Sequence, residues 1–360
     1  MYDFVVVGAG PAGSRFARRA AEEGYDVLAL EQGSVGKPLA CSGHVSTDLW
    51  EYTPDGAREA LLQNEISGAR FHVGGPDSEA YPFYTDGTIS NVIDRVGLDE
   101  RLADAARSAG ADLREHHTVT GVEETADHVV VSASTSDGSA EFRARMVAGC
   151  DGPVSRVRRD LSIPEPDELL HGVLGFVETE DASEFVDVHL TAPRFFAWRI
   201  PRGEAGVEYG LAAPPGKEVR ELFDEFTSGY GVDTVDFCSG AIPIGPPDRV
   251  TSDRGFLVGD AAAQTKPFTG GGILYGMTAA DHAAERIDPA DPGTLSDYET
   301  AWRDDLSREI RLGTWLRRAY SLPEPVQTAG LRAVSGEIGV HMDRPTSLFS
   351  RDQLRALLRS

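Results

Sequence analysis

The pattern of apolar and polar positions predicts alternating strands and helices over most of the chain. Apolar runs bounded by glycine, proline or charged residues indicate strands, whereas apolar residues three or four positions apart indicate helices. The predicted strands lie at residues 4–7, 27–30, 116–122, 128–133, 173–177, 185–190, 195–200, 207–211 and 255–260, and the predicted helices at residues 14–23, 100–108, 218–228, 273–287 and 295–320.

Changes in this pattern divide the chain into three regions. The predicted fold class is α/β: a Rossmann-type nucleotide-binding domain, a strand-rich (α+β) second domain and a helical C-terminal region. The first domain is discontinuous, because a strand hairpin and a longer strand-rich stretch interrupt it. The predicted boundaries are residues 1–64, 91–162 and 246–290 for the first domain, 65–90 and 163–245 for the second, and 291–360 for the C-terminal region.

The turn after the first strand carries a dinucleotide-binding motif, Gly8-Ala9-Gly10-Pro11-Ala12-Gly13. The first glycine permits a tight turn, the second lets the backbone approach a pyrophosphate, and the third lets helix and strand pack closely. The N–H groups at the start of the following helix attract an anion. Glu31 lies at the end of the second strand, where it would accept hydrogen bonds from both ribose hydroxyls of FAD or NAD.

A second glycine-rich loop follows the strand that ends at Asp260. Gly270, Gly271 and Gly272 stand immediately before the helix predicted at residues 273–287. Successive glycines admit close backbone approach, and a helix N-terminus stabilises negative charge, such as that near N1 of a flavin. The alternative is a turn that only caps a core helix. With the first motif in the same chain, a second contact to a nucleotide cofactor is favoured.

Composition narrows the possible surroundings and partners. The 360 residues carry a formal net charge of -24, and Lys37, Lys217 and Lys266 are the lysines of the chain. An acidic surface poor in lysine indicates adaptation to concentrated salt and disfavours nucleic acid as a partner. No apolar run is long enough to span a membrane, and the three cysteines are widely spaced. We expect a cytoplasmic protein in a reducing compartment, with no metal and at most peripheral membrane contact.

Three features recur together in the FAD enzymes shaped like aromatic hydroxylases. They are the first glycine motif, Cys150-Asp151-Gly152 followed by Ser155 and Arg158, and Gly259-Asp260 with its glycine-rich loop. Within that class the sequence resembles the geranylgeranyl reductase family, which includes archaeal enzymes that saturate isoprenoid lipids. The narrower resemblance, over most of residues 1–300, lies in Ala40-Cys41-Ser42-Gly43, in Arg95, Asp99 and Leu102, and in Phe196-Ala197-Trp198-Arg199-Ile200-Pro201, which is similar to the family's Tyr-x-Trp-x-Phe-Pro.

The resemblance implies an FAD-dependent reductase of isoprenoid C=C bonds in geranylgeranyl chains, with hydride transfer from flavin N5 and a proton donor. Cys41 is the implied proton donor, and Phe196 and Trp198 would shape a slot for the prenyl chain. The electron donor would be reduced ferredoxin or NAD(P)H. The positions implied to line FAD are Gly8, Gly10, Ala12, Gly13, Glu31, Gly43, Arg95, Val119, Asp260, Gly271, Gly272 and Ile273.

Several alternatives stay open at the level of sequence. Cys41 could be a small buried apolar residue, Phe196 and Trp198 could be plain core, and Asp151 could cap a turn. A prenylated quinone would suit the same site as a phospholipid. The chain could also be a monooxygenase or halogenase of the same fold, because Phe-x-Trp-x-Ile-Pro is close to the halogenases' Trp-x-Trp-x-Ile-Pro. A non-catalytic flavoprotein that passes electrons to a partner is the third possibility.

Overall fold

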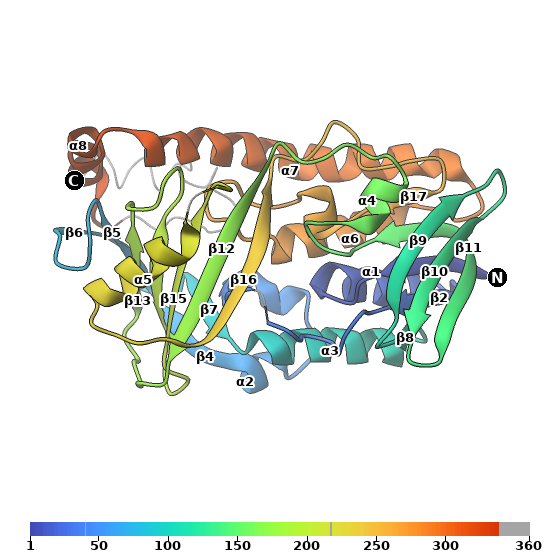
Figure 1. Cartoon of the computed structure of the whole chain (residues 1–360), viewed down its shortest axis with the longest axis horizontal. Helices are drawn as coiled ribbons and strands as arrows, with labels where there is room; N and C mark the ends of the chain where they lie inside the picture. The colour runs from blue at the N-terminus through green and yellow to red at the C-terminus, as the bar shows by residue number, and fades with distance from the viewer. Residues whose placement is uncertain (40, 217, 338–360) are drawn as a thin grey trace.

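The computed structural model describes residues 1–39, 41–216 and 218–337 of the chain (Figure 1). Ala40 of the predicted Cys41 loop, Lys217 and the last part of the predicted C-terminal region, residues 338–360, lie outside the described residues. The described part forms two large sheets at opposite ends of an elongated molecule, with long helices running between them (Figure 1).

The first sheet is seven-stranded within the described part, and its central strands are parallel. β1 (Tyr2–Val7) lies at the centre of this sheet. Its last four residues, from Phe4 to Val7, are all buried, because the sheet is covered on both faces. Two antiparallel strands extend one edge. In spatial order the strands are β8 (Asp112–Arg114), β2 (Val27–Leu30), β1 (Tyr2–Val7), β11 (Gly138–Gly149), β10 (Val129–Thr135) and β9 (Thr118–Glu124), and β17 (Gly255–Leu257) also pairs with β11.

Four helices stack beside this sheet in the order α3, α1, α6 and α7, from bottom to top in Figure 1. α1 buries Gly13, Phe16, Ala17 and Ala20, a spacing that places one face of the helix against the core. Asp94 caps the N-terminus of α3 by accepting hydrogen bonds from two backbone N–H groups. The helices of this region are α1 (Pro11–Glu22), α3 (Arg95–Ser108), α4 (Arg156–Asp160), α6 (Ile273–Arg286) and α7 (Leu295–Arg317), with 3-10 turns η2 (Gly259–Ala262) and η3 (Pro292–Thr294).

The second sheet is also seven-stranded within the described part and is antiparallel except at one pair. The hairpin predicted at residues 65–90 provides the last two strands at one side of this sheet, β5 (Gly68–His72) and β6 (Ala80–Tyr84). β5 pairs with β13 (Phe185–His189), more than one hundred residues later in the chain, and β6 pairs with β5. α5 (Val219–Gly229) packs on this sheet. In spatial order the strands are β16 (Val235–Ile244), β12 (Glu168–Val177), β15 (Val207–Ala213), β14 (Ala197–Pro201), β13 (Phe185–His189), β5 (Gly68–His72) and β6 (Ala80–Tyr84).

A small third sheet and the described helices after residue 294 complete the molecule. α7 runs along the upper side of the molecule from the first sheet toward the second, where α8 follows it (Figure 1). Among the described helices, none is long and apolar enough to cross a membrane. The remaining elements are β3 (His44–Ser46), β7 (Ser90–Ile93) and β4 (Leu62–Ile66) of the small sheet, with η1 (Thr47–Glu51), α2 (Ala57–Leu61), η4 (Arg318–Ser321) and α8 (Glu324–Val334).

The observed elements differ from the sequence prediction mainly at their ends. α3 begins at Arg95 instead of residue 100, because Asp94 supplies a cap that the apolar pattern does not reveal. β16 is a ten-residue strand that the pattern did not predict. Its first three residues are exposed, so it lacks the apolar alternation by which a strand is recognised.

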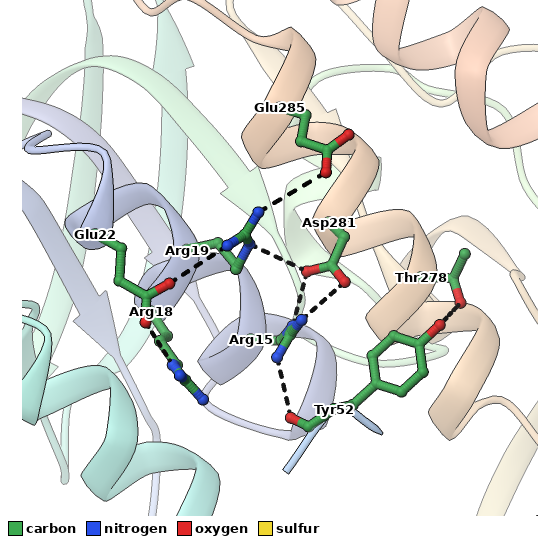
Figure 2. A network of polar contacts seen from close by, with 8 residues as sticks. All are labelled: Arg15, Arg18, Arg19, Glu22, Tyr52, Thr278, Asp281 and Glu285. Atoms are coloured by element: carbon green, nitrogen blue, oxygen red, sulfur yellow. Dashed lines mark hydrogen bonds and ion pairs between the residues drawn. The ribbon is translucent and has the colours of Figure 1, made fainter. Parts of the chain in front are cut away.

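An ion-pair network fastens α1 to α6 (Figure 2). Nε and Nη2 of Arg15 donate to the two carboxylate oxygens of Asp281 at 2.7 and 2.9 Å, and Nη1 donates to the carbonyl of Tyr52. The Tyr52 hydroxyl hydrogen-bonds Thr278 one turn earlier on α6. The Arg15 and Asp281 side chains are only 13% and 23% exposed, so water screens this bidentate pair weakly.

We expect Asp281→Asn to lower the free energy of unfolding by about 1–2 kcal/mol, because it breaks a charge-assisted, half-buried pair. Glu285→Gln is the matched control on the same helix. Glu285 is 50% exposed and 3.8 Å from Arg19, so its change should stay within about 0.5 kcal/mol. Chemical denaturation of both variants measures the difference; equal losses would contradict the structural role of Asp281.

Candidate functional site

The N-terminus of α1 faces a cavity and carries the first glycine motif. Gly8 has φ +94°, and a Cβ there would lie 2.4 Å from the carbonyl oxygen of Cys150. A Cβ on Gly13 would lie 2.0 Å from the carbonyl oxygen of Gly8, so both positions require glycine. Gly10 is the N-cap residue and lines the cavity with Pro11 and Ala12. The helix therefore presents its N–H groups to the cavity without a side-chain cap.

Glu31 lies directly after β2 and beside this turn. Its carboxylate accepts hydrogen bonds from the backbone N–H groups of Ala9, at 2.9 Å, and Gly33, at 3.2 Å. These bonds fix the orientation of the carboxylate next to the glycine motif. Its remaining acceptor capacity suits a ribose hydroxyl.

A second helix N-terminus, that of α6, opens onto the same cavity. Gly272 is its N-cap residue, and Gly271, Gly272 and Ile273 line the cavity. A Cβ on Gly272 would lie 2.4 Å from Oδ1 of Asp260, which also lines the cavity. Burial raises the pKa of Asp260 to about 6. Two positive helix ends and a carboxylate thus converge on one space.

Arg95, at the start of α3, places a guanidinium at the cavity wall. Arg95 and Asp99 are 8% and 7% exposed, and Nη1 of Arg95 lies 2.6 Å from Oδ1 of Asp99. Nε of Arg95 has no hydrogen-bond partner among the described residues. A buried donor without a partner is costly, and an anionic ligand in the cavity would satisfy it.

The cavity measures about 890 Å³ and extends from these helix ends to the second sheet and to α7, η4 and α8. Val186, Val188 and Leu190 of the β13 region contribute an apolar wall, and Leu316 and Tyr320 approach from α7 and η4. Cys41 lines the cavity as well, and burial raises the pKa of its thiol despite the opposing charge of Arg95. The thiol therefore stays protonated near neutral pH.

Phe196 and Trp198 project from one face of the β14 region into the cavity. The Trp198 ring lies so close to β15 that a Cβ on Gly210 would be 2.1 Å from it. Phe196 packs edge-on against Trp198 and Tyr320, with centroid distances of 5.8 and 5.6 Å. The pair shapes the slot at the centre of the cavity.

Other predicted site residues lie behind the cavity wall or away from it. Gly8, Gly13 and Glu31 support the turn from behind. Gly43 lets its loop pass close to Ile93, because a Cβ on Gly43 would lie 2.3 Å from the carbonyl oxygen of Ile93. Val119 lies in β9 within the apolar core of the first sheet and is absent from the residues that line the cavity. Asp151 accepts hydrogen bonds from Ser155, Arg156 and Val157, which makes it a turn cap.

Two residues of the site escaped sequence reasoning. Glu208, on β15, is buried and accepts a hydrogen bond from the Trp198 indole at 2.8 Å. Tyr320 reaches the cavity from the C-terminal region, and its hydroxyl donates to the carbonyl of Phe268. The only available signal for Glu208 was a charged residue inside an apolar strand run. No cluster of three or more His, Cys, Asp or Glu side chains in the described ranges is placed to hold a metal ion.

Comparisons with known proteins agree with this geometry. Residues 1–208 match the FAD binding domain family. The chain is 32% identical to digeranylgeranylglycerophospholipid reductase 2 of Methanopyrus kandleri, with 89% of this chain and 87% of that protein covered. The chain belongs to the geranylgeranyl reductase family. It is an FAD-dependent oxidoreductase, and the uncapped helix ends, the glycine turns and Nε of Arg95 fit that cofactor.

Solved structures confirm the predicted fold. A geranylgeranyl bacteriochlorophyll reductase-like protein from Thermoplasma acidophilum superposes with a TM-score of 0.86 at 22% identity and covers 100% of this chain and 96% of its own. A p-nitrophenol 4-monooxygenase from Pseudomonas putida superposes with a TM-score of 0.73 at 19% identity, covering 100% and 97%. This member of the geranylgeranyl reductase family thus shares its fold with a monooxygenase that acts on an aromatic substrate.

We expect Asp260→Asn to stabilise the FAD-free protein at pH 8 by up to about 3 kcal/mol. Burial raises the folded-state pKa of Asp260 to about 6, so its favourable protonation is present at low pH and is lost as the pH rises through that value. The gain should vanish near pH 4, where wild-type Asp260 is protonated. Denaturation at both pH values measures it.

Asp181→Asn is the control, for which the free energy of unfolding at pH 8 should change in the opposite direction. Burial opposes ionisation of Asp181, but bonds from Ser183 and Arg199 outweigh it and lower the pKa of this carboxyl. This variant should therefore lose stability at pH 8. A stabilisation by Asp260→Asn that does not depend on pH would show that ionisation of Asp260 is not its cause.

Proposed function

We propose that the protein reduces isoprenoid C=C bonds of geranylgeranyl chains, most directly in archaeal-type membrane lipids. The observation that carries this proposal is the single cavity that runs from the FAD-binding helix ends to an apolar wall formed by the second sheet. Each buried CH₂ group contributes about 0.8 kcal/mol, so such a wall holds a long hydrocarbon chain without polar contacts. The similarity to digeranylgeranylglycerophospholipid reductase 2 of Methanopyrus kandleri supports the same substrate class.

When bound, reduced FAD supplies a hydride. The chain supplies the proton and the dry surroundings, because an isolated alkene has no carbonyl to stabilise developing charge. Cys41 is the proton donor in this proposal: it lines the cavity, and burial keeps its thiol protonated. Trp198 and Phe196 orient the prenyl chain across the cavity. Reduced ferredoxin or NAD(P)H would deliver the electrons.

The deciding experiment is an anaerobic single turnover in concentrated salt. The holoenzyme is reduced with dithionite, which removes the need for a natural electron donor, and is mixed with a geranylgeranyl phospholipid. Reoxidation of the flavin with a mass gain of two hydrogens per bond is the expected result. If the flavin stays reduced with lipid and is reoxidised only when oxygen is admitted, the protein is a monooxygenase. If that oxygen-dependent reaction also consumes halide, it is a halogenase. Electron cycling without any alkene product would identify a non-catalytic flavoprotein.

Cys41→Ala should slow lipid-dependent flavin reoxidation by about 10²–10⁴-fold, the contribution of a positioned general acid. Bound FAD, followed by its absorbance, should be retained. Cys238→Ala is the matched control, because Cys238 is also a cavity-lining thiol but stands on β16. It should change the rate by less than about twofold. If Cys41→Ala reacts as fast as wild type, water is the donor and the role of Cys41 is positional.

α7 and the segment after it carry an exposed face that suits a lipid surface. This face lies beside the exposed lining residues Leu322 and Val326, which mark the cavity mouth. Trp315 is 61% exposed, and Arg308, Arg311 and Arg318 are exposed at helical spacing from it. Leu322 and Val326, exposed by 45% and 51%, belong to the cavity lining. A basic and aromatic face on a chain of net charge -24 favours an anionic membrane surface, from which the substrate enters.

The double substitution Trp315→Ala with Arg311→Gln should weaken binding to anionic vesicles by roughly tenfold or more at low salt, measured by co-sedimentation. Arg220→Gln with Phe237→Ala is the matched control. Arg220 lies 4.2 Å from the ring centroid of exposed Phe237 on the α5 side of the second sheet, so an arginine and an aromatic ring are lost elsewhere. Equal losses in both pairs would contradict a docking face at the cavity mouth.

A further inference from the structure

Glu208 is a buried acid that the reductase chemistry leaves without a role. It lies in β15, an interior strand of the second sheet, and is 1% exposed. Oε1 of Glu208 accepts a hydrogen bond from Nε1 of Trp198 at 2.8 Å. Burying a carboxylate is costly unless donors compensate, and an apolar residue of similar size would pack here at lower cost. Its presence therefore calls for a specific reason.

The same carboxylate also contacts the loop that carries Cys41. The Ser42 side chain, the Gly43 backbone N–H and the Arg202 guanidinium lie close enough to this carboxylate to favour its charged form and lower its pKa. Burial nevertheless raises the pKa of Glu208. One side chain on an interior strand thus lies between two parts of the cavity wall that are far apart in sequence. These are Trp198 on β14 and the segment that carries Cys41 and Ser42 before β3, called here the Cys41 loop.

We propose that Glu208 is a positioning residue that holds the Cys41 loop and the Trp198 ring in a fixed relation across the cavity. Gly210 contributes by leaving room for the ring against β15, where a Cβ would lie 2.1 Å from it. With both groups anchored to one carboxylate, a chain that packs on Trp198 lies at a constant distance from the thiol. The catalytic consequence rests on the proposed function, whereas the anchoring of the loop does not.

The test is the rate at which a small maleimide alkylates Cys41 in the oxidised holoenzyme without substrate. Peptide mass spectrometry resolves Cys41 from Cys150 and Cys238. Glu208→Gln should raise the Cys41 rate by about tenfold, the effect of losing one charged polar contact on a local opening equilibrium. The rates of the other two cysteines should stay within about twofold, since local opening leaves the rest of the fold closed.

Asp187→Asn is the matched control. Asp187 is 5% exposed and stands on β13, where its alternation with cavity-lining Val186 and Val188 puts it on the opposite face of the sheet. It pairs there with Arg70 and Arg199. This variant removes an equally buried charge from the same sheet without touching the loop, so the Cys41 rate should not change.

Ser42→Ala tests the same anchor from the loop and removes no buried charge, so it remains informative if Glu208→Gln does not fold. It should raise the Cys41 rate in the same direction, and the double variant should add little to Glu208→Gln because both changes break one contact. Glu208→Asp, whose carboxylate is one CH₂ shorter, should not restore the wild-type rate.

Unchanged labelling of Cys41 in both Glu208→Gln and Ser42→Ala would overturn the proposal, as would an equal rise for all three cysteines. Labelling needs no lipid, so this result is independent of the reductase assay. In the anaerobic assay Glu208→Gln should lower the maximal rate of lipid-dependent flavin reoxidation. The lipid concentration that gives half of this maximal rate should change by a smaller factor. If Glu208→Gln reoxidises its flavin at the wild-type rate although Cys41 is labelled faster, the loop is anchored by Glu208 but this anchoring does not matter for catalysis.

Discussion

The close approach of α1, α6 and the tip of β17 is the constraint on which the rest of the structure depends. A Cβ on Gly259 would lie 2.9 Å from the Cβ of Ala12, and one on Gly276 would lie 3.0 Å from the Cα of Gly259. Only small residues let two helix N-termini meet beside the same strand end. Because both ends carry partial positive charge and lack side-chain caps, the cofactor completes an electrostatic arrangement that the backbone alone leaves open.

The C-terminal region extends this arrangement to the far end of the cavity. Tyr298 and Trp302 of α7 are fully buried in the core of the first sheet. The Tyr298 hydroxyl donates to the carbonyl of Leu257 and accepts from Gln264, whose own oxygen accepts from the N–H of Gly259. The same helix leads to Tyr320 in the slot. α7 is therefore part of the core, and deleting it would remove the support of the Asp260 loop along with the cavity mouth.

The amino-acid sequence predicts the parts of this molecule in which one residue type is required locally. The glycines of both turns, Glu31 after β2 and Asp260 after β17 are such positions, because backbone geometry or strand order dictates them. Arg95 and Cys41 were reached through family resemblance. The sequence placed residues 65–90 in the same domain as residues 163–245, but not the parallel pairing of β5 with β13. The approach of Tyr320 to Phe196 and of Glu208 to Ser42 was likewise not predicted, because these contacts arise only on folding. For Val119 the strand was predicted, but the side chain, which was expected to line FAD, packs in the core of the first sheet.

The position of charge around the cavity limits how a lipid can enter it under the proposed function. An ionised headgroup loses its hydration in an apolar space unless it is paired, so the wall formed by β13 and β14 cannot accommodate it. The headgroup must then stay at the mouth, near the exposed arginines of α7, while the hydrocarbon chain passes Phe196 and Trp198. A hydrocarbon chain that is held only by dispersion and apolar burial makes no polar contact that fixes its position, so it can slide along the cavity. A fixed thiol and a fixed aromatic ring supply the alignment that the substrate itself lacks, which is why the anchoring of both by one buried carboxylate matters for the reaction.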